Sequence, residues 1–148
     1  MTVNQLSVFI ENKPGSLAHF ADLLRENNID LRALSIADVE DYGILRVIVN
    51  DVHKTSIVLK NAGYVFKITP VVAVPLSDKP GNLADVLDIL GDAGINIEYL
   101  YAFVGRQAGK AYVIFRMRDC DIERADQVLA GAGYPPLSEE DLRRMDRD

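Results

Sequence analysis

The sequence has a single cysteine, no long apolar run and no cluster of basic residues, and each absence excludes a class of protein. Cys120 alone can form neither an intramolecular disulfide nor a cysteine-based metal site, which fits a reducing compartment. No stretch approaches the roughly 20 apolar residues of a membrane-spanning helix. Without a Lys/Arg-rich stripe, and with a net charge of −6, the chain lacks the electrostatic footprint of nucleic-acid or anionic-membrane binding.

The remaining composition is that of an ordinary globular protein. Hydrophobic residues make up 49% of the chain and charged residues 26%, a balance that argues against extended disorder. The segment Met1–Gln5 has no basic stretch followed by an apolar one, so we expect no secretion signal and a cytoplasmic location. The 148 residues suit either one domain or two small ones.

An internal repeat decides between these possibilities. The segment 12–18 (NKPGSLA) recurs as 78–84 (DKPGNLA), at an offset of 66 residues, and further matched positions follow at the same offset. Later, the Ala-Gly-Tyr of residues 62–64 recurs at residues 132–134, at an offset of 70. A collinear series of this kind indicates two copies of one unit.

Each copy shows the pattern strand, helix, strand, strand, helix, strand. We therefore predict an α+β fold with two ferredoxin-like βαββαβ units in tandem, each with an antiparallel sheet and both helices on one face. The first domain is expected to span residues 1–69, and the second residues 70–148 with a short C-terminal helical tail. The predicted strands cover 5–10, 31–39, 44–49 and 64–68 in the first copy, and 71–76, 95–104 and 111–117 in the second. The predicted helices cover 17–27, 51–62, 81–93 and 122–130.

Particular residues support these ranges. Leu6, Val8 and Ile10 alternate with Gln5, Ser7 and Phe9, which predicts a half-buried strand. Leu17, Phe20, Ala21 and Leu24 form an apolar helical stripe, and the second helix carries Ile57 and Val58. Asp51 is placed to cap that helix and Gly63 to end it, and residues 40–43 form the hairpin turn. Tyr134-Pro135-Pro136 limits any final strand to a short edge piece, and Ser138 precedes a helix start with acids in its first turn.

The two strand-to-helix loops, Asn12–Leu17 and Asp78–Leu83, resemble the N/D-x-P-G-x-L signature of ACT domains. Asn28–Leu31 and Gly94–Ile97 resemble the G-x-N-I stretch at the second strand of that family. The resemblance covers nearly the whole chain and weakens after about residue 134. It implies regulatory modules that pair side by side and bind amino acids at the seam between them. We accordingly expect a sensor of a free amino acid that forms a homodimer, needs no cofactor and is not an enzyme.

The loop residues suit the two charged groups of an amino acid. Gly15 and Gly81 let a ligand approach the backbone, and the helix start presents N–H donors to a carboxylate. Asn12 and Asp78 carry oxygens that can accept from an ammonium group. The full set of predicted ligand-binding residues is Asn12, Lys13, Pro14, Gly15, Ser16, Leu17, Asp30, Leu31, Asp78, Lys79, Pro80, Gly81, Asn82, Leu83, Asn96 and Ile97.

Other interpretations of these residues remain open at this point. Each Pro-Gly can be a simple turn, Asn12 and Asp78 can be helix caps, and core positions suit Leu17, Leu31 and Ile97 better than a pocket. A Cys–His nucleophile pair is disfavoured because Asp119 and Asp121 flank Cys120. The acidic turn at Asp38, Glu40 and Asp41 lacks the spacing of a calcium loop. The alternative function is a non-catalytic subunit that acts on a partner enzyme of amino-acid metabolism through protein contacts.

Overall fold

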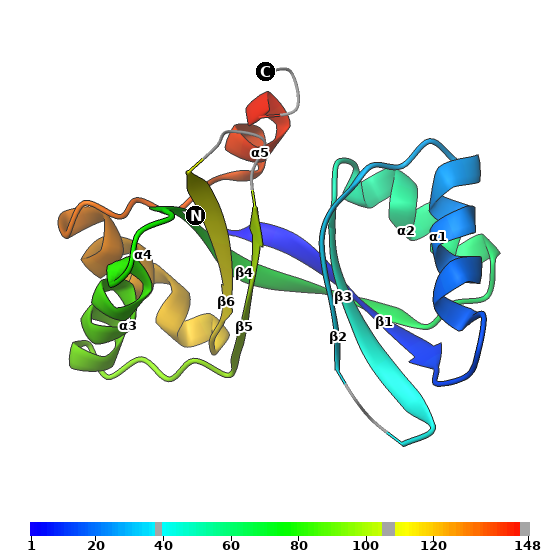
Figure 1. Ribbon diagram of the computed structural model, residues 1–148, viewed down its shortest axis with the longest axis horizontal. Coiled ribbons are helices and arrows are strands. Elements are labelled where there is room, and N and C mark those ends of the chain that lie inside the picture. The colour runs from blue at the N-terminus through cyan, green and yellow to red at the C-terminus, as the bar shows by residue number, and fades with distance from the viewer. Residues whose placement is uncertain (38–39, 105–108, 146–148) are drawn as a thin grey trace. The chain divides into compact units, whose positions relative to one another are not determined.

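A computed structural model describes residues 1–37, 40–104 and 109–145 of the chain. The chain divides into two compact units, one of residues 4–69 and the other of residues 1–3 with 70–148 (Figure 1). Within the described residues, no helix has the length and apolar character needed to cross a bilayer.

The N-terminal unit contains β1 (Val3–Glu11), α1 (Ser16–Glu26), β2 (Leu31–Ala37), β3 (Tyr42–Val49), α2 (Val52–Asn61) and the start of β4 (Phe66–Ser77). The strand order is β2-β3-β1-β4, and β3 runs antiparallel to both β1 and β2. Both helices cover the same face of this sheet (Figure 1). The core between these helices and the sheet contains Leu6, Val8, Ile10, Phe20, Leu24, Ile29, Leu45, Val47, Val49 and Leu59.

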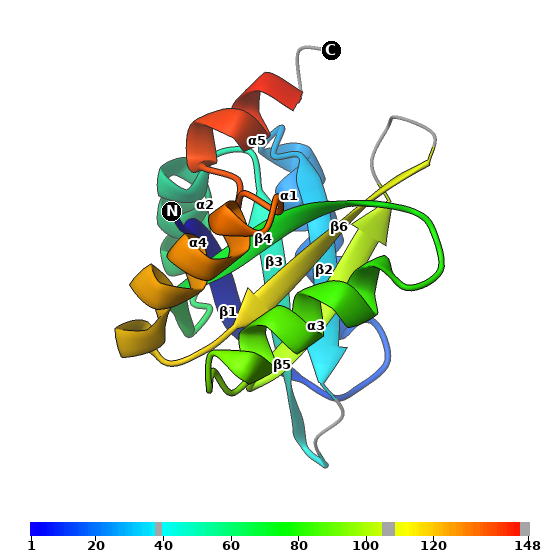
Figure 2. The same ribbon diagram turned by 90° about the vertical axis from the view of Figure 1, so that its left-hand side faces the viewer.

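The C-terminal unit repeats this plan without its final strand, with the rest of β4, α3 (Asn82–Asp92), β5 (Tyr99–Val104), β6 (Lys110–Arg116) and α4 (Ile122–Gly131). A short 3₁₀ turn, Asp119–Asp121, precedes α4, and α5 (Glu139–Met145) ends the described chain. The strand order is β4-β6-β5, and α3 and α4 lie on one face of it (Figure 2). Its core contains Val72, Val74, Leu76, Val86, Leu90, Ile95, Val113, Phe115, Met117, Ala125 and Leu129. The predicted α+β class is confirmed.

Several strand boundaries differ from the predicted ones, three of them for a clear physical reason. The strands predicted over 64–68 and 71–76 are one strand, β4, because the fixed φ of Pro70 is compatible with extended backbone. β5 begins at Tyr99 and not at residue 95, since the Ile95 N–H donates to the Leu90 carbonyl at 3.0 Å and closes α3. β3 already begins at Tyr42, which pairs with Glu11, so the predicted turn over 40–43 is too long. β2 ends at Ala37, and residues 38–39 of the predicted strand lie outside the described residues.

The sequence predicted the ends of the helices better than it predicted which residues are buried. The Lys54 N–H donates to the Asp51 carboxylate at 3.0 Å, so the predicted cap is confirmed, and Gly63 follows the end of α2 with a φ of 83°. Ala21 and Ile57, however, are exposed. Gln5 is buried although the alternation placed it outward, and its amide donates to the Ser7 hydroxyl at 3.0 Å.

After α4, residues 132–138 form no strand, so even the short edge piece that the two prolines left possible is absent. One backbone hydrogen bond, from the Leu137 N–H to the Ala73 carbonyl at 2.8 Å, ties this segment to β4. The predicted helix start at Ser138 is confirmed by α5. Residues 146–148 of the predicted tail lie outside the described residues.

Candidate functional site

The loop between β1 and α1 is held in shape by its own backbone. The Asn12 N–H donates to the Asp41 carbonyl at 2.8 Å, and the Lys13 N–H to the Glu11 carbonyl at 3.1 Å. Gly15 then takes a left-handed conformation with a φ of 85°, which an L-residue adopts only at a cost. This conformation turns the chain directly into α1, so Gly15 is required for the turn itself.

The second loop has a similar backbone framework. The Asp78 N–H donates to the Gly109 carbonyl at 2.8 Å, and the Lys79 N–H to the Ser77 carbonyl at 2.8 Å. Gly81 has a φ of 94° and precedes α3 as Gly15 precedes α1. The duplicated sequence motif therefore specifies a duplicated backbone loop.

Two hollows flank the first loop. The larger one, of about 550 Å³, is lined by Lys13, Pro14, Gly15 and Ser16 together with residues of β1, α1, the hairpin and the segment after α2. The smaller, of about 330 Å³, is lined by Asn12, Lys13, Ser16 and Leu17 with residues of β2 and β3. The larger volume is within the usual range of small-molecule sites. All predicted residues of the first loop thus border one or both hollows.

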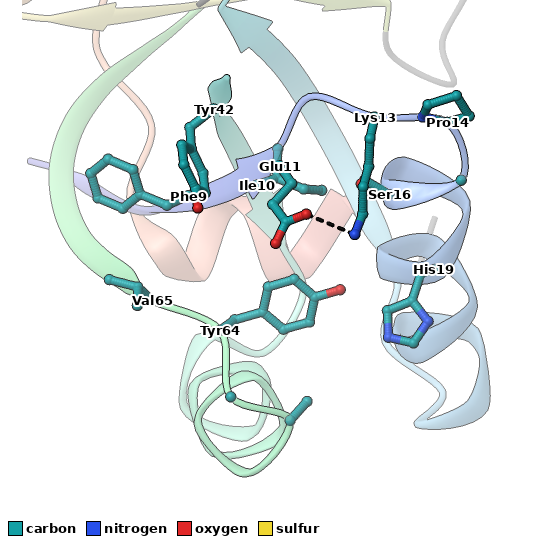
Figure 3. A pocket seen from close by; sticks show the side chains of 13 residues that line it. Phe9, Ile10, Glu11, Lys13, Pro14, Ser16, His19, Tyr42, Tyr64 and Val65 are labelled. Atoms are coloured by element: carbon teal, nitrogen blue, oxygen red, sulfur yellow. Dashed lines mark ion pairs between the residues drawn. The ribbon is translucent and has the colours of Figure 1, made fainter. Parts of the chain in front are cut away.

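The larger hollow holds a pair of opposite charges. The Lys13 ammonium lies 2.7 Å from the Glu11 carboxylate, and both side chains are largely exposed. The hydrogen bond and the charge of Glu11 raise the pKa of Lys13 above its ordinary value. Figure 3 shows this pair facing the ring of Tyr64. The hollow therefore presents both a positive and a negative group to solvent.

Tyr64 is fixed at the opposite wall by the end of α2. The Gly63 N–H donates to the Lys60 carbonyl at 3.1 Å and the Tyr64 N–H to the Leu59 carbonyl at 3.0 Å, the pair of bonds that ends a helix at a left-handed glycine. The Tyr64 ring packs edge-on against Phe20, at 5.6 Å between centroids. Burial raises the pKa of Tyr64.

The aromatic and apolar side chains around this hollow are unusually exposed. Phe9 is 50% exposed, Tyr42 54% and Val65 66%. The His19 ring stands 6.4 Å from that of Tyr64, centroid to centroid. Large apolar side chains of this kind usually pack inside a protein, so their gathering around one hollow marks a surface suited to a ligand.

The predicted second-strand residues lie elsewhere within each unit. Asp30 and Leu31 are at the start of β2, whereas the Asn12 loop lies beside its end at Ala37. The Asp30 N–H donates to the Asn50 side-chain oxygen at 3.1 Å. Asn96 and Ile97 precede β5 in the same way, and Leu31 and Ile97 both pack against the cores. Neither unit brings these residues to its own strand-to-helix loop.

The other interpretations of the loop residues can now be compared with the structure. The interpretation of Asn12 and Asp78 as helix caps is wrong, because the caps are Gly15 and Gly81 and neither helix start has a side-chain cap. The Asn12 amide instead donates to the Glu40 carbonyl at 3.1 Å. Leu17 is 46% exposed, so its assignment to the core is also wrong. In the second loop, the Asn82 amide donates to the Ser77 carbonyl at 2.8 Å and Leu83 is partly exposed.

Catalytic and metal chemistry find little support in the described part of the chain. Cys120 is exposed on the 3₁₀ turn of the C-terminal unit, while both histidines belong to the N-terminal one. Across residues 1–37, 40–104 and 109–145, no three His, Cys, Asp or Glu side chains gather as metal ligands. Asp38 of the acidic turn lies outside the described residues.

Most residues that line the larger hollow were not predicted from the sequence, among them Phe9, Glu11, His19, Tyr42 and Tyr64. One signal could have identified two of them. Glu11 directly precedes the loop motif and Phe9 lies two residues before Glu11, yet their counterparts at the offset of 66, Ser77 and Pro75, are chemically different. Differences between the copies next to a shared loop point to specialisation of one copy.

A duplicated ferredoxin-like unit with a left-handed glycine at each strand-to-helix loop defines a pair of ACT-type modules. The family model described as an ACT domain pair matches residues 1–145. The chain is also similar to protein BT0572 from Bacteroides thetaiotaomicron, with 38% identity, a TM-score of 0.88, and coverage of 97% of this chain and 96% of that one. The chain belongs to the ACT domain pair family, and the predicted resemblance is confirmed.

More distant structures share the fold. The regulatory subunit of aspartate kinase from Thermus thermophilus matches with a TM-score of 0.63 and 14% identity, over 88% of this chain and 92% of that one. The regulatory subunit of aspartate kinase from Thermus flavus matches with a TM-score of 0.57 and 16% identity, over 87% and 91%. At such identities the likeness concerns the fold alone. No curated protein matches the chain.

Proposed function

We propose that this protein is a non-catalytic, cytoplasmic regulatory protein that binds a free amino acid at its glycine-opened strand-to-helix loops. The observation that carries the proposal is the N-terminal loop, where a left-handed Gly15, a hollow of about 550 Å³ and a Lys13–Glu11 charge pair coincide. An amino acid carries one charge of each sign, and charge-assisted hydrogen bonds to such a pair are the strong ones. The domain limits 1–69 and 70–148 form part of this proposal. A ligand position at a seam between two modules stays a prediction.

A thermal-shift screen with each of the twenty amino acids at millimolar concentration tests the proposal. A ligand that binds only the folded state raises the unfolding temperature. We expect at least one amino acid to do so, and a well-folded protein that responds to none would contradict the proposal.

The variant Gly15→Val tests the place of binding. A Cβ at Gly15 meets no atom within 4 Å, so a valine there projects into open space beside the loop and obstructs it. Gly133→Val is the matched control, because Gly133 has a similar φ of 89° and no atom within 4 Å of its added Cβ. The two variants carry the same backbone strain, but only Gly15→Val should lose the ligand-induced shift.

The outer strand of the N-terminal unit supports a second, compatible role in protein contacts. β2 is the edge strand of its sheet, and Leu34 and Ile36 on it are both largely exposed. Edge strands offer unpaired backbone groups to another chain. We propose that a second copy of this chain pairs here to form a homodimer, with a partner enzyme of amino-acid metabolism as the alternative occupant.

A further inference from the structure

The two copies of the loop share a backbone turn but differ in the side chains beside it. Glu11 is replaced by Ser77 in the second copy, which removes the negative charge, and Phe9 is replaced by Pro75, which removes a ring. These positions correspond because the hydrogen bonds of the two loops correspond, from Lys13 to the Glu11 carbonyl and from Lys79 to the Ser77 carbonyl. The Glu11 carboxylate and the Phe9 ring are thus found in the first copy only, while the carboxylate of the second loop is that of Asp78, one position further along the chain.

In the second copy, a polar contact joins the two side chains that correspond to His19 and Tyr64. His19 corresponds to Asp85, and Tyr64 corresponds to Tyr134. The Tyr134 hydroxyl donates to the Asp85 carboxylate at 3.4 Å, whereas His19 and Tyr64 meet only as tilted rings with centroids 6.4 Å apart. The second copy satisfies these side chains internally, and the first leaves them facing the hollow.

The contents of the first hollow point to a class of ligand. Figure 3 shows the Lys13–Glu11 pair on one side, with the rings of Phe9, Tyr42 and Tyr64 ranged along the rest of the wall. The charged pair suits an ammonium and a carboxylate on the same carbon, as in an α-amino acid. The rings suit an aromatic side chain, since aromatic pairs gain about 0.5–1.5 kcal/mol beyond their buried area.

We propose that the hollow of the N-terminal unit is the single amino-acid site of this chain and that it selects aromatic amino acids. Glu11 accepts from the ligand ammonium and Lys13 donates to its carboxylate, so the ligand exchanges the internal ion pair for two new ones. Phe9, Tyr42 and Tyr64 enclose the aromatic side chain. This inference rests on the proposed function, because it names the ligand class and the copy that binds.

Calorimetric titration of the full chain with phenylalanine, alanine and 3-phenylpropionate tests the inference. We expect one phenylalanine per chain and a Kd at least tenfold lower than that of alanine. 3-Phenylpropionate retains the ring and carboxylate but lacks the ammonium group, so it should bind about 10- to 100-fold more weakly, as expected for loss of a hydrogen bond to a charged group. Two phenylalanine sites per chain, or equal affinity for alanine, would overturn the inference.

The variant Glu11→Gln identifies the partner of the ammonium group. It should reduce affinity for phenylalanine about 10- to 100-fold while hardly changing that for 3-phenylpropionate, so the preference between them disappears. Lys13→Met should weaken both ligands, because both carry the carboxylate. Lys60→Met, at an exposed lysine in the last turn of α2, is the control and should weaken neither. If Glu11→Gln keeps the preference for phenylalanine, the inference is wrong.

The outcomes separate the inference from the proposed function. Binding of some other amino acid, with no effect of Glu11→Gln, contradicts the aromatic site but leaves amino-acid binding intact. Failure of all twenty amino acids to bind contradicts both. A folded-state check by circular dichroism accompanies each variant, and Phe9→Ala gives a second test with no charge change, expected to weaken phenylalanine about 3- to 10-fold.

Discussion

At the scale of single residues, the loop glycines contribute conformation and not side-chain space. Gly15 and Gly81 both have left-handed backbones, and an added Cβ at either meets nothing within 4 Å. Any cost of substitution therefore comes from the positive φ and not from a clash. This distinction makes the glycines testable by stability measurements alone.

We expect Gly81→Val to lower the free energy of unfolding by about 1–2 kcal/mol or somewhat more, the cost of a left-handed L-residue. Urea denaturation followed by circular dichroism measures it, and the folded spectrum should be unchanged. Gly91→Ala is the control, since Gly91 lies within α3 without a positive φ. It should stabilise the protein by up to about 1 kcal/mol. Equal effects of the two substitutions would contradict the conformational explanation.

Tyr64 gives the candidate site a dependence on alkaline pH. Burial raises its pKa above the ordinary value of 10.0, so the folded state holds the phenol proton more tightly than the unfolded chain. The contribution of the protonated Tyr64 to the free energy of unfolding is complete below pH 10 and is lost as the pH rises through the pKa of Tyr64 in the folded state. Stability should therefore fall above pH 10.

Tyr64→Phe should reduce this alkaline loss, as measured by urea denaturation between pH 8 and pH 11. Some loss should remain, because burial and the Asp85 carboxylate also raise the pKa of Tyr134. Identical pH profiles for the variant and the original protein would show that Tyr64 does not contribute.

The site could be predicted only in part, because some of its residues are close together in the sequence and others meet only in the folded protein. The Pro-Gly loops were found because their pattern is local and repeated, and the structure gives them one backbone framework. Glu11 and Tyr64 were missed because the chain separates them by α1, the hairpin and α2, and only folding brings them to one hollow. The start of β2, by contrast, was included on family likeness, although its own unit places it away from the loop.

At the scale of secondary-structure elements, α5 tests whether residues close together in the sequence are enough to predict the start of a helix. Its start is a reciprocal cap, in which the Asp141 N–H donates to the Ser138 hydroxyl at 3.1 Å and the Ser138 N–H donates to the Asp141 carboxylate at 2.8 Å. These bonds from Ser138 lower the pKa of Asp141. Leu142 is buried, so the helix is also anchored by packing.

Ser138→Ala should destabilise α5 by about 1 kcal/mol, seen as faster amide hydrogen exchange in residues 139–145. Because the pKa of Asp141 is lowered on folding, the cap's contribution is present above the ordinary carboxyl pKa of 3.8 and is lost as the pH falls through the folded pKa. After correction for the intrinsic exchange rate at each pH, acid should therefore lower the protection of these amides in the original protein more than in Ser138→Ala. Arg143→Ala, at an exposed position of the same helix, is the control and should exchange normally.

The ends of the helices could be predicted from the sequence better than the burial of the side chains along them. Asp51 and Gly63 act through hydrogen bonds to neighbours in the chain, so their signals need no knowledge of the fold. Ile57 was placed on the buried face of α2 because it is apolar, yet Thr55 and Leu59 occupy that face. Thr55 can do so because its hydroxyl donates to the Asp51 carbonyl at 2.7 Å. Burial is set by tertiary packing, which a single sequence does not state.

At the scale of the whole molecule, the proposed homodimer can be separated from ligand binding. Leu34→Glu places a charge on the exposed edge strand β2, and charged edge residues oppose strand pairing. Light scattering after size-exclusion chromatography should show a dimer for the original chain and a monomer for the variant. Leu100→Glu, at the position matched by the offset of 66 on β5, is the control and should stay dimeric. A monomeric original protein would contradict the dimer but not the ligand site.

The central claim is that an amino acid occupies the hollow beside the Asn12–Leu17 loop. Crystals of the protein grown with phenylalanine test it most directly. The account predicts density for one ligand per chain, with its ammonium within hydrogen-bond distance of Glu11 and its carboxylate within the same distance of Lys13. Density for the ligand elsewhere, with the Lys13–Glu11 ion pair still closed at 2.7 Å, would contradict it.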